Sequence, residues 1–394
     1  MLVVPPTPTP RPAFYRPELD GLRFFAFAFV FMSHAFSQNP DVYARMGIPR
    51  GLAFVCARFV GSGGNGVLLF FVLSSYLITS LLLREHERFG VIRLRDFYAR
   101  RALRIMPLYF GFIAAVYLLI PQGSHAALET KLLPGFLLFL ANWSFLLPNI
   151  TTGGGVAGVL WSVSVEEQFY LLWALALRGF GVAKIGRMAA VLIGTALATR
   201  ALMIAYGASI YALTFNTFCL LDAIGAGALL ALAFRRGLPT LSAASRAALL
   251  LAGPLAWTAS SCLWVWGYSY NLLAAVNLVG AIAMICGTLG GRLLSPAPLV
   301  YLGRISYGLY VFHAAAIYVA QRALPPSVRQ IALAFGLTLT AAALSYQFFE
   351  APFLRLKRRF THVASRPVDG TAADPEPAAV AGPATAQQPE SGAY

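Results

Sequence analysis

Two ionisable residues, Arg23 and His34, lie in one apolar segment near the start of the chain, LDGLRFFAFAFVFMSH. In a helix this spacing of eleven positions is close to three turns, so both side chains share one face, about 16 Å apart. An ionisable group inside an apolar span normally faces a bundle interior or a wet cavity. Because an imidazole titrates near neutral pH, His34 is a candidate general base. The alternative is that Arg23 is an interface anchor and His34 a hydrogen-bonded core residue.

Two adjacent glutamates, Glu166 and Glu167, lie inside a second apolar stretch, WSVSVEEQFY. Carboxylates are costly there, and on a helix the two point about 100° apart, so at most one can share a face with a given partner. One of them is a candidate to orient a histidine, and the sequence does not distinguish which. The alternative is that these carboxylates pair with arginines such as Arg23 or Arg304.

Two arginines, Arg101 and Arg104, stand at positions i and i+3 in FYARRALRIMPLYF, at the predicted cytoplasmic mouth of an apolar span. One helix face then offers two planar guanidinium groups to phosphate oxygens. The spacing therefore favours a ligand that carries phosphate, and the alternative is a pair of positively charged membrane anchors.

A second intramembrane histidine, His313, lies in ISYGLYVFH. A packed and hydrogen-bonded His313 is favoured over a catalytic one, because Tyr307 and Tyr310 beside it offer partners. Arg200 and Asp222 lie in consecutive spans at depths that an arginine can bridge, and we interpret them as a structural ion pair.

The composition indicates the class of protein. Of the 394 residues, 58% are hydrophobic and only 11% are charged, whereas soluble domains have about 25% charged residues. The chain is therefore expected to be an all-α polytopic membrane protein. Its net charge of +15 comes from basic residues that flank apolar runs, which favours the positive-inside rule over nucleic-acid binding. Four scattered cysteines without CxxC spacing predict neither a metal site nor a disulfide framework.

The apolar runs predict about ten transmembrane helices and one short segment, Leu132–Leu147, that does not cross. This segment contains Pro134, Gly135 and Asn142, so we interpret it as re-entrant or interfacial. The glycine cluster GSGGNG before the second span is expected to allow close backbone approach. The predicted spans are Leu22–Gln38, Gly66–Leu83, Ile105–Ile120, Val159–Leu177, Met188–Tyr206, Tyr211–Phe234, Ala247–Trp266, Leu272–Leu289, Leu299–Ala320 and Ile331–Phe349.

The charge distribution orients these spans with both termini in the cytoplasm, and makes Arg84–Arg104 a basic cytoplasmic loop. Inside segments then hold 21 of the 30 Lys and Arg residues, and outside loops hold 6, as the positive-inside rule requires. Residues 1–18, with the run PPTPTPRP, are expected to form an extended cytoplasmic lead. Residues 19–360 form the membrane domain, and residues 361–394, rich in Pro, Ala and Gly, a disordered cytoplasmic tail.

Five stretches, in order, resemble the acyltransferase-3 family of bacterial integral-membrane acyltransferases. They are LDGLR with ten residues between its arginine and a histidine, GVLLFFVLSSYLIT, FYARRALRIMPLYF, WSVSVEEQFY, and LGRISYGLYVFH with LSYQFFEAPF. Together they extend over nearly the whole membrane part of the chain. The resemblance implies an enzyme of about ten spans in the bacterial inner membrane that moves an acyl group, commonly from acyl-CoA, to a hydroxyl.

The resemblance also implies roles for single residues. His34 matches the family's candidate general base, and Arg23 matches the arginine paired with it. Glu166 and Glu167 match its paired glutamates and join His34 as expected catalytic residues. Arg101 and Arg104 match a motif thought to meet the donor's phosphates. The expected substrate-binding residues, all within these stretches, are Arg23, Arg101, Arg104, Asp20, Ser74, Tyr76 and His313.

The predicted function is membrane-bound O-acyl transfer, with acetyl-CoA as the expected donor and a sugar, glycan or glycosylated metabolite as the acceptor. Membrane lipid is the expected surrounding partner, and no bound cofactor or metal is expected. The alternative is a transporter or flippase for a glycan or lipid intermediate, which would also have ten spans and buried charges. The motifs are not placed as an inverted repeat, which favours the enzyme.

Overall fold

A computed structural model describes residues 15–147, 154–238, 240–265, 267 and 269–361, so most of the predicted lead and tail lie outside the described residues. Every regular element described is helical, which confirms the all-α prediction. The first helix begins inside the predicted lead. The α-helices are α1 (Pro17–Ala35), α2 (Pro40–Arg45), α3 (Arg50–Ser62), α4 (Asn65–Phe89), α5 (Leu94–Leu119), α6 (Leu133–Leu137), α7 (Ala141–Ser144), α8 (Trp161–Phe180), α9 (Ile185–Ala205), α10 (Ile210–Phe215), α11 (Leu221–Ala233), α12 (Ala243–Val265), α13 (Tyr270–Thr288), α14 (Ala297–Arg304), α15 (Ser306–Ala323), α16 (Val328–Leu344) and α17 (Ala351–Lys357).

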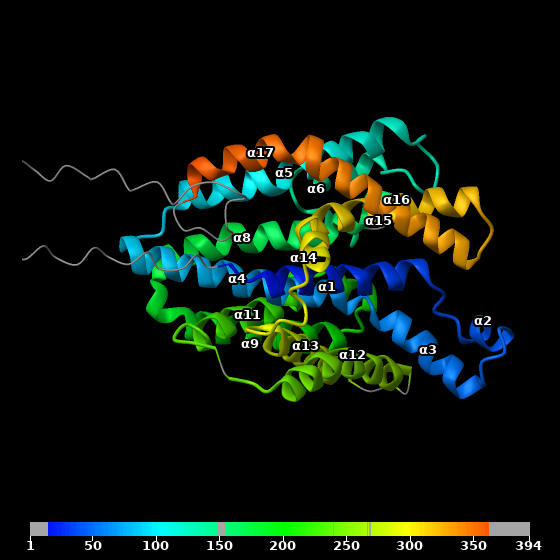
Figure 1. Cartoon of the computed structure of the whole chain (residues 1–394), viewed down its shortest axis with the longest axis horizontal. Helices are drawn as coiled ribbons and strands as arrows, with labels where there is room; N and C mark the ends of the chain where they lie inside the picture. Colours follow the sequence, from blue (N-terminus) through cyan, green and yellow to red (C-terminus); the bar gives the residue numbers. More distant parts are fainter. Residues whose placement is uncertain (1–14, 148–153, 239, 266, 268, 362–394) are drawn as a thin grey trace, which may run out of the picture. The chain divides into compact units, whose positions relative to one another are not determined.

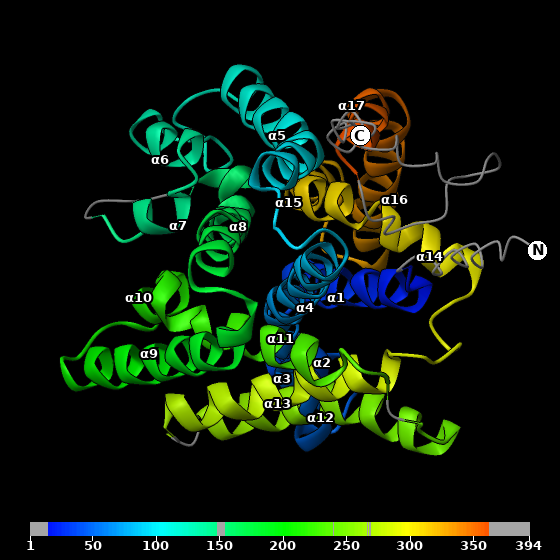
Figure 2. The same ribbon diagram turned by 90° about the vertical axis from the view of Figure 1, so that its left-hand side faces the viewer.

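Helix α4 lies near the middle of the bundle, with α8 on one side and α11 and α13 on the other (Figure 2). It packs against α1, α11 and α13, and its side chains Leu69, Val72 and Ile78 are fully buried. Helix α14 crosses the direction of its neighbours and packs on α1 (Figure 1). Helix α4 thus contacts α1 and α8, two of the helices that carry candidate residues.

Two glycines let helices meet backbone to backbone. A Cβ atom on Gly66, at the start of α4, would overlap the carbonyl oxygen of Ala26 in α1. A Cβ atom on Gly303, in α14, would overlap the carbonyl oxygen of Asp20. Only glycine leaves room for such contacts. The first contact confirms the close approach predicted for the GSGGNG cluster, although most of that cluster is itself helical.

Six helical segments in the described residues are long and apolar enough to cross a membrane, and they contain α4, α5, α9, α12, α13 and α16. Each of these helices coincides with a predicted span, and the chain is a polytopic membrane protein. The other four predicted spans coincide with α1, α8, α10–α11 and α14–α15. These helices carry the intramembrane charges or are interrupted, and their crossing stays a prediction.

Two of the predicted spans are broken. Tyr211–Phe234 is interrupted at Asn216, whose side chain accepts a hydrogen bond from the backbone N–H of Phe218 and starts a new helical turn. Leu299–Ala320 is interrupted at Ile305, between α14 and α15. Hydropathy reports apolar content and not helix continuity, so the sequence pattern reveals neither break.

The predicted length of the basic loop Arg84–Arg104 is wrong, because most of these residues are helical. Helix α4 continues until Gly90, whose φ of 70° is the left-handed conformation in which glycine commonly ends a helix. Helix α5 then begins at Leu94. Arg101 and Arg104 therefore lie on a helix, where their spacing places them one turn apart.

The short segment Leu132–Leu147 folds into two pieces, α6 with five residues and α7 with four. At 1.5 Å per residue each piece rises less than about 8 Å, far short of a hydrocarbon core of about 30 Å. These lengths agree with a segment that does not cross.

Candidate functional site

The imidazole rings of His34 and His313 are neighbours, with 5.1 Å between their centroids. His34 lies in the last turn of α1, where its Nδ1 is 2.9 Å from the carbonyl oxygen of Val30 and its side chain is exposed. His313, in α15, is fully buried, and its Nε2 has no hydrogen-bond partner among the described residues. The fold therefore joins two predicted site residues from distant parts of the chain.

His313 is packed and hydrogen-bonded as predicted, and of the two expected partners it contacts Tyr310 but not Tyr307. Its Nδ1 lies 2.5 Å from the carbonyl oxygen of Tyr310, not from a tyrosine hydroxyl. The Tyr310 hydroxyl donates to the carbonyl oxygen of Val159, and the Tyr307 hydroxyl donates to that of Ile105. Both hydroxyls tie α15 to neighbouring segments instead of to His313.

Arg23 lies near the opposite end of α1 from His34. Its Nη1 is 2.7 Å from Oδ1 of Asp20, one turn earlier, and Asp20 is buried. In the described part of the chain its carboxylate partner is thus Asp20, and not Glu166 or Glu167. The helical rise leaves about 16 Å between Arg23 and His34, so they do not meet directly.

Arg101 lies beside a cavity of about 450 Å³ lined by α5, α8 and the segment between α6 and α7. Its guanidinium carbon is 5.0 Å from the centre of the Tyr170 ring and 5.8 Å from that of Phe97. Such cation–π contacts hold the guanidinium group in place. Most of the lining is apolar, and its polar members are Tyr98, Arg101, Glu167, Gln168 and Tyr170.

Arg104 has other neighbours than Arg101. Its Nη2 donates to the carbonyl oxygen of Arg304 at 3.1 Å, and its Nη1 lies 3.9 Å from Oε2 of Glu350. Glu350 is buried and ends a π-helical segment that begins at Ser345. Such segments are often found at functional sites. Of the two predicted phosphate ligands, Arg101 thus lines the cavity and Arg104 lies beside a buried carboxylate.

The structure separates the two adjacent glutamates. The hydroxyl of Tyr170 donates to Oε1 of Glu166. Glu167 lines the cavity instead, and its Oε1 is buried without a hydrogen-bond partner among the residues that the structure describes. Because neighbouring side chains on a helix point about 100° apart, the two carboxylates contact different residues. Of the two glutamates, Glu167 is therefore the one that lines the cavity.

Ser74 and Tyr76, both in α4, also lie in different surroundings. Ser74 hydrogen-bonds the side chain of Tyr170, which lines the cavity. Tyr76 is buried and interacts electrostatically with Glu18 and Arg84. Ser74 therefore reaches the cavity through one intervening side chain, whereas Tyr76 belongs to the region around the start of α1.

The cavity and the histidine pair lie at different positions along α5. Phe112 of α5 packs against Phe312, the residue before His313, with 5.7 Å between ring centroids. Arg101 precedes Phe112 by eleven residues, which is about 16 Å along the helix axis. A ligand that touched both places would have to be extended.

Comparison with known proteins identifies the family. Residues 16–348 match a family described as an acyltransferase domain, acyltransferase 3. The chain belongs to the acyltransferase 3 family. This confirms the resemblance, and the matched region contains every candidate residue of this acyltransferase domain except Glu350. No solved structure matches the chain.

Two relatives of this acyltransferase show the extent of the similarity. The chain is 28% identical over 375 residues to the peptidoglycan O-acetyltransferase OatA of Listeria monocytogenes, with 86% of this chain and 56% of that protein covered. It is 27% identical over 371 residues to the O-acetyltransferase OatA of Staphylococcus aureus, with 86% of this chain and 57% of that protein covered. The chain thus spans just over half the length of these relatives.

Sequence reasoning missed three residues of the acyltransferase site, namely Gln168, Tyr170 and Glu350. Gln168 and Tyr170 stand directly after the paired glutamates, and Glu350 stands in LSYQFFEAPF. The signal was present, because a polar side chain inside an apolar helix is costly whether it is an acid, an amide or a phenol. Gln168 and Tyr170 carry no charge, however, and Glu350 stands one residue beyond the predicted span Ile331–Phe349.

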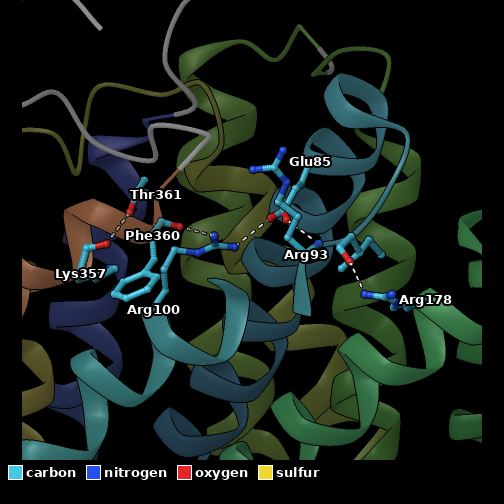
Figure 3. A network of polar contacts seen from close by, with 8 residues as sticks. Glu85, Arg93, Arg100, Arg178, Lys357, Phe360 and Thr361 are labelled. Carbon is cyan, nitrogen blue, oxygen red and sulfur yellow. Dashed lines mark hydrogen bonds and ion pairs between the residues drawn. The ribbon is translucent and has the colours of Figure 1, made fainter. Parts of the chain in front are cut away.

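A buried ion pair fixes the start of α5 in the acyltransferase (Figure 3). Nη2 of Arg100 lies 2.9 Å from Oε2 of Glu85, and both side chains are buried. Oε1 of Glu85 accepts from the backbone N–H of Arg93, and Nη1 of Arg100 donates to the carbonyl oxygen of Phe360 at 2.7 Å. Arg100 precedes Arg101, so this network anchors the turn of α5 that carries the cavity arginine.

The predicted structural ion pair is confirmed. Nη2 of Arg200 lies 2.8 Å from Oδ2 of Asp222, and both side chains are buried. The Nε of the same guanidinium donates to Asn271, and its Nη1 donates to the carbonyl oxygen of Cys219. A buried charge that is paired and hydrogen-bonded in this way needs no ligand.

Proposed function

We propose that this acyltransferase domain moves an acetyl group from acetyl-CoA to a hydroxyl of a glycan. The observation that carries the proposal is the position of Arg101, held between two aromatic rings at the edge of a cavity of about 450 Å³. A planar guanidinium recognises phosphate oxygens well, and a donor such as acetyl-CoA carries several phosphates.

The donor enters from the cytoplasm with its phosphates near Arg101 and Arg104 and its thioester deeper in the protein. The positive-inside charge distribution supports this orientation. The protein then lies in the bacterial inner membrane with both termini on the cytoplasmic side. The spacing of about 16 Å along α5 between Arg101 and the level of His313 suits the long arm that joins the phosphates of CoA to its thioester. The histidines then stand at the acyl end.

His34 is the proposed general base. The acceptor oxygen attacks the thioester carbonyl carbon while the imidazole takes the hydroxyl proton. The carbon–sulfur bond then breaks, and CoA leaves as a thiol after His34 returns that proton. His34 suits this role because its side chain is exposed and therefore accessible to an acceptor. The ring of His313 packs against that of His34, with 5.1 Å between their centroids, and orients the His34 imidazole.

The remaining candidates have supporting roles. Glu167 lines the cavity, where its carboxylate accepts a hydrogen bond from the donor. Arg23 and Asp20 form an ion pair at the start of α1, on the cytoplasmic side of the proposed path. The glycan class of acceptor is supported by one relative, the peptidoglycan O-acetyltransferase OatA of Listeria monocytogenes.

The test compares bacterial cells with and without this protein by mass spectrometry of their glycans and lipids. A species heavier by one acetyl group, present only with the protein, names both the acyl group and the acceptor. Purified protein that releases CoA thiol from acetyl-CoA only when that acceptor is added completes the assignment. An unchanged glycan and lipid profile, together with no binding of acetyl-CoA, would overturn the proposal.

A further inference from the structure

Three polar side chains, of which Asn142 is fully buried and Gln168 and Thr217 are half-buried, close a ring of hydrogen bonds beside the cavity. Nε2 of Gln168 donates to Oδ1 of Asn142 at 2.9 Å, and Nδ2 of Asn142 donates to the hydroxyl of Thr217 at 2.9 Å. The Thr217 hydroxyl donates in turn to Oε1 of Gln168 at 2.7 Å. Each member both donates and accepts, so the ring is fully satisfied, and such networks fix their members firmly.

The ring joins three segments that are far apart in the sequence. Gln168 belongs to α8, Asn142 to α7, and Thr217 to the turn between α10 and α11. Asn142 is fully buried and also donates to the carbonyl oxygen of Phe215. The ring therefore fixes the position and orientation of the α6–α7 segment relative to α8.

Gln168 makes one more hydrogen bond, and it reaches a strained residue. Its Nε2 donates at 2.7 Å to the carbonyl oxygen of Phe139, which has a φ of 55° and is the one non-glycine residue with positive φ among those that the structure describes. A bulky side chain pays a steric cost in this left-handed conformation, so the surroundings must enforce it. The bond from Gln168 is one such constraint.

The conformation of Phe139 matters because it shapes the cavity. Its ring stacks on Tyr109, with 4.5 Å between centroids and 29° between ring planes. Phe139 and Leu138 line the same cavity as Arg101 and Glu167. If Phe139 relaxed to a negative φ, its ring and the neighbouring leucine would turn, and the wall contributed by the broken segment would move.

We propose that Gln168 is a positioning residue for the donor: by holding Phe139 in its left-handed conformation it sets the wall of the Arg101 cavity and thereby the affinity for acetyl-CoA. This inference rests on the proposed function, because it takes that cavity as the donor site. Gln168 acts through the backbone of Phe139 and takes no part in moving the acyl group.

The test is the affinity of the purified protein for acetyl-CoA in detergent, measured by calorimetry beside its turnover. Gln168→Glu keeps the size of the side chain and its acceptance from Thr217, but a carboxylate cannot donate to Phe139 or Asn142. We expect at least a tenfold weaker affinity and a matching rise in KM, with kcat at saturating donor nearly unchanged. Gln330→Glu is the matched control, since Nε2 of Gln330 also donates to a backbone carbonyl, that of Leu324, at 2.7 Å.

A second substitution separates positioning from general support of the fold. Phe139→Gly makes a positive φ free of steric cost, so in that background Gln168→Glu should change the affinity less than threefold. An equal loss in both backgrounds, or a folded Gln168→Glu protein with wild-type affinity, would overturn the inference.

Arg101→Ala shows which proposal has failed. If wild-type protein binds acetyl-CoA, Arg101→Ala weakens that binding and Gln168→Glu leaves it intact, only the role of Gln168 is lost. If wild-type protein does not bind acetyl-CoA at all, the donor site itself is lost and the inference falls with it.

Discussion

His34 at the end of α1 and His313 in α15 lie with their rings 5.1 Å apart between centroids, one exposed and the other fully buried. The Phe27 and Tyr310 rings also pack against His313, at 6.1 and 5.4 Å. The buried ring therefore sets the position of the exposed one. The proposed function gives proton transfer to His34 and orientation to His313, and this asymmetry in burial makes their substitutions distinguishable.

His34→Ala is expected to lower turnover by about 10² to 10⁴-fold, the contribution of a positioned base, while acetyl-CoA affinity stays at the wild-type value. The imidazole touches no predicted phosphate contact, so only the chemical step should suffer. His313→Ala is the comparison. It opens a hole in a packed region and should lower thermal stability by about 2 kcal/mol or more. A His34→Ala protein with turnover within tenfold of wild type would remove His34 from the role of base.

Arg101→Ala is expected to weaken acetyl-CoA binding by about 1.5 to 3 kcal/mol, the value of a hydrogen bond to a charged group. Arg101→Lys should not restore binding, because an ammonium cannot stack on Phe97 and Tyr170 or bind phosphate in a fork. Arg104→Ala should weaken binding similarly. Calorimetry on the purified variants measures these changes, with the exposed Arg236→Ala as the control. Wild-type affinity in both the Arg101→Ala and the Arg104→Ala variants would return the pair to the role of membrane anchors.

Glu167→Gln is expected to reduce turnover about tenfold or more, because it removes the carboxylate that faces the cavity. Glu166→Gln should stay near wild type, because an amide oxygen can still accept the hydrogen bond from Tyr170. Parallel assays of the two isosteric variants decide which glutamate is functional. The reverse ranking would assign the role to Glu166.

Glu85→Leu and Arg100→Met are each expected to destabilise the protein by about 3 kcal/mol, because each leaves a buried charge without its partner. The double variant should be more stable than the sum of the single effects predicts, since no charge remains. Thermal unfolding in detergent gives all four corners of this cycle. Strict additivity would show that the ion pair in Figure 3 contributes no coupling.

Single cysteines at Arg95 and at Lys184 are expected to react with a membrane-impermeant thiol reagent only from the cytoplasmic side, in a chain without its native cysteines. Both residues are exposed, and the α-helices described between α5 and α8 are the short α6 and α7, which cannot span. A cysteine at Gln122, also exposed, should react from the opposite side. Labelling of Arg95 and Lys184 from different sides would refute the ten-helix topology.

The sequence predicts the helical fold and the non-crossing segment from hydropathy. The cost of a polar group among apolar ones points to His34, Glu166, Glu167 and His313, whereas Asp20, Ser74 and Tyr76 are expected only from the family resemblance. The sequence does not predict which of these residues meet. The contact of His34 with His313 depends on tertiary packing, and so does the divergence of Arg101 and Arg104. The break at Ile305 leaves no mark in hydropathy.

The anchoring of Arg100 by the carbonyl oxygen of Phe360 has a consequence for the order of biosynthesis. The two partners are 260 residues apart, so the ribosome has made nearly the whole described chain before this bond can form. The α4–α5 hairpin can pair Glu85 with Arg100 early, within its own length, but it stays open on one side until the last helical turn is released. Closure of that end of the bundle is thus a late checkpoint of synthesis, and a nascent chain terminated before Phe360 would present an incomplete guanidinium site to quality-control proteases.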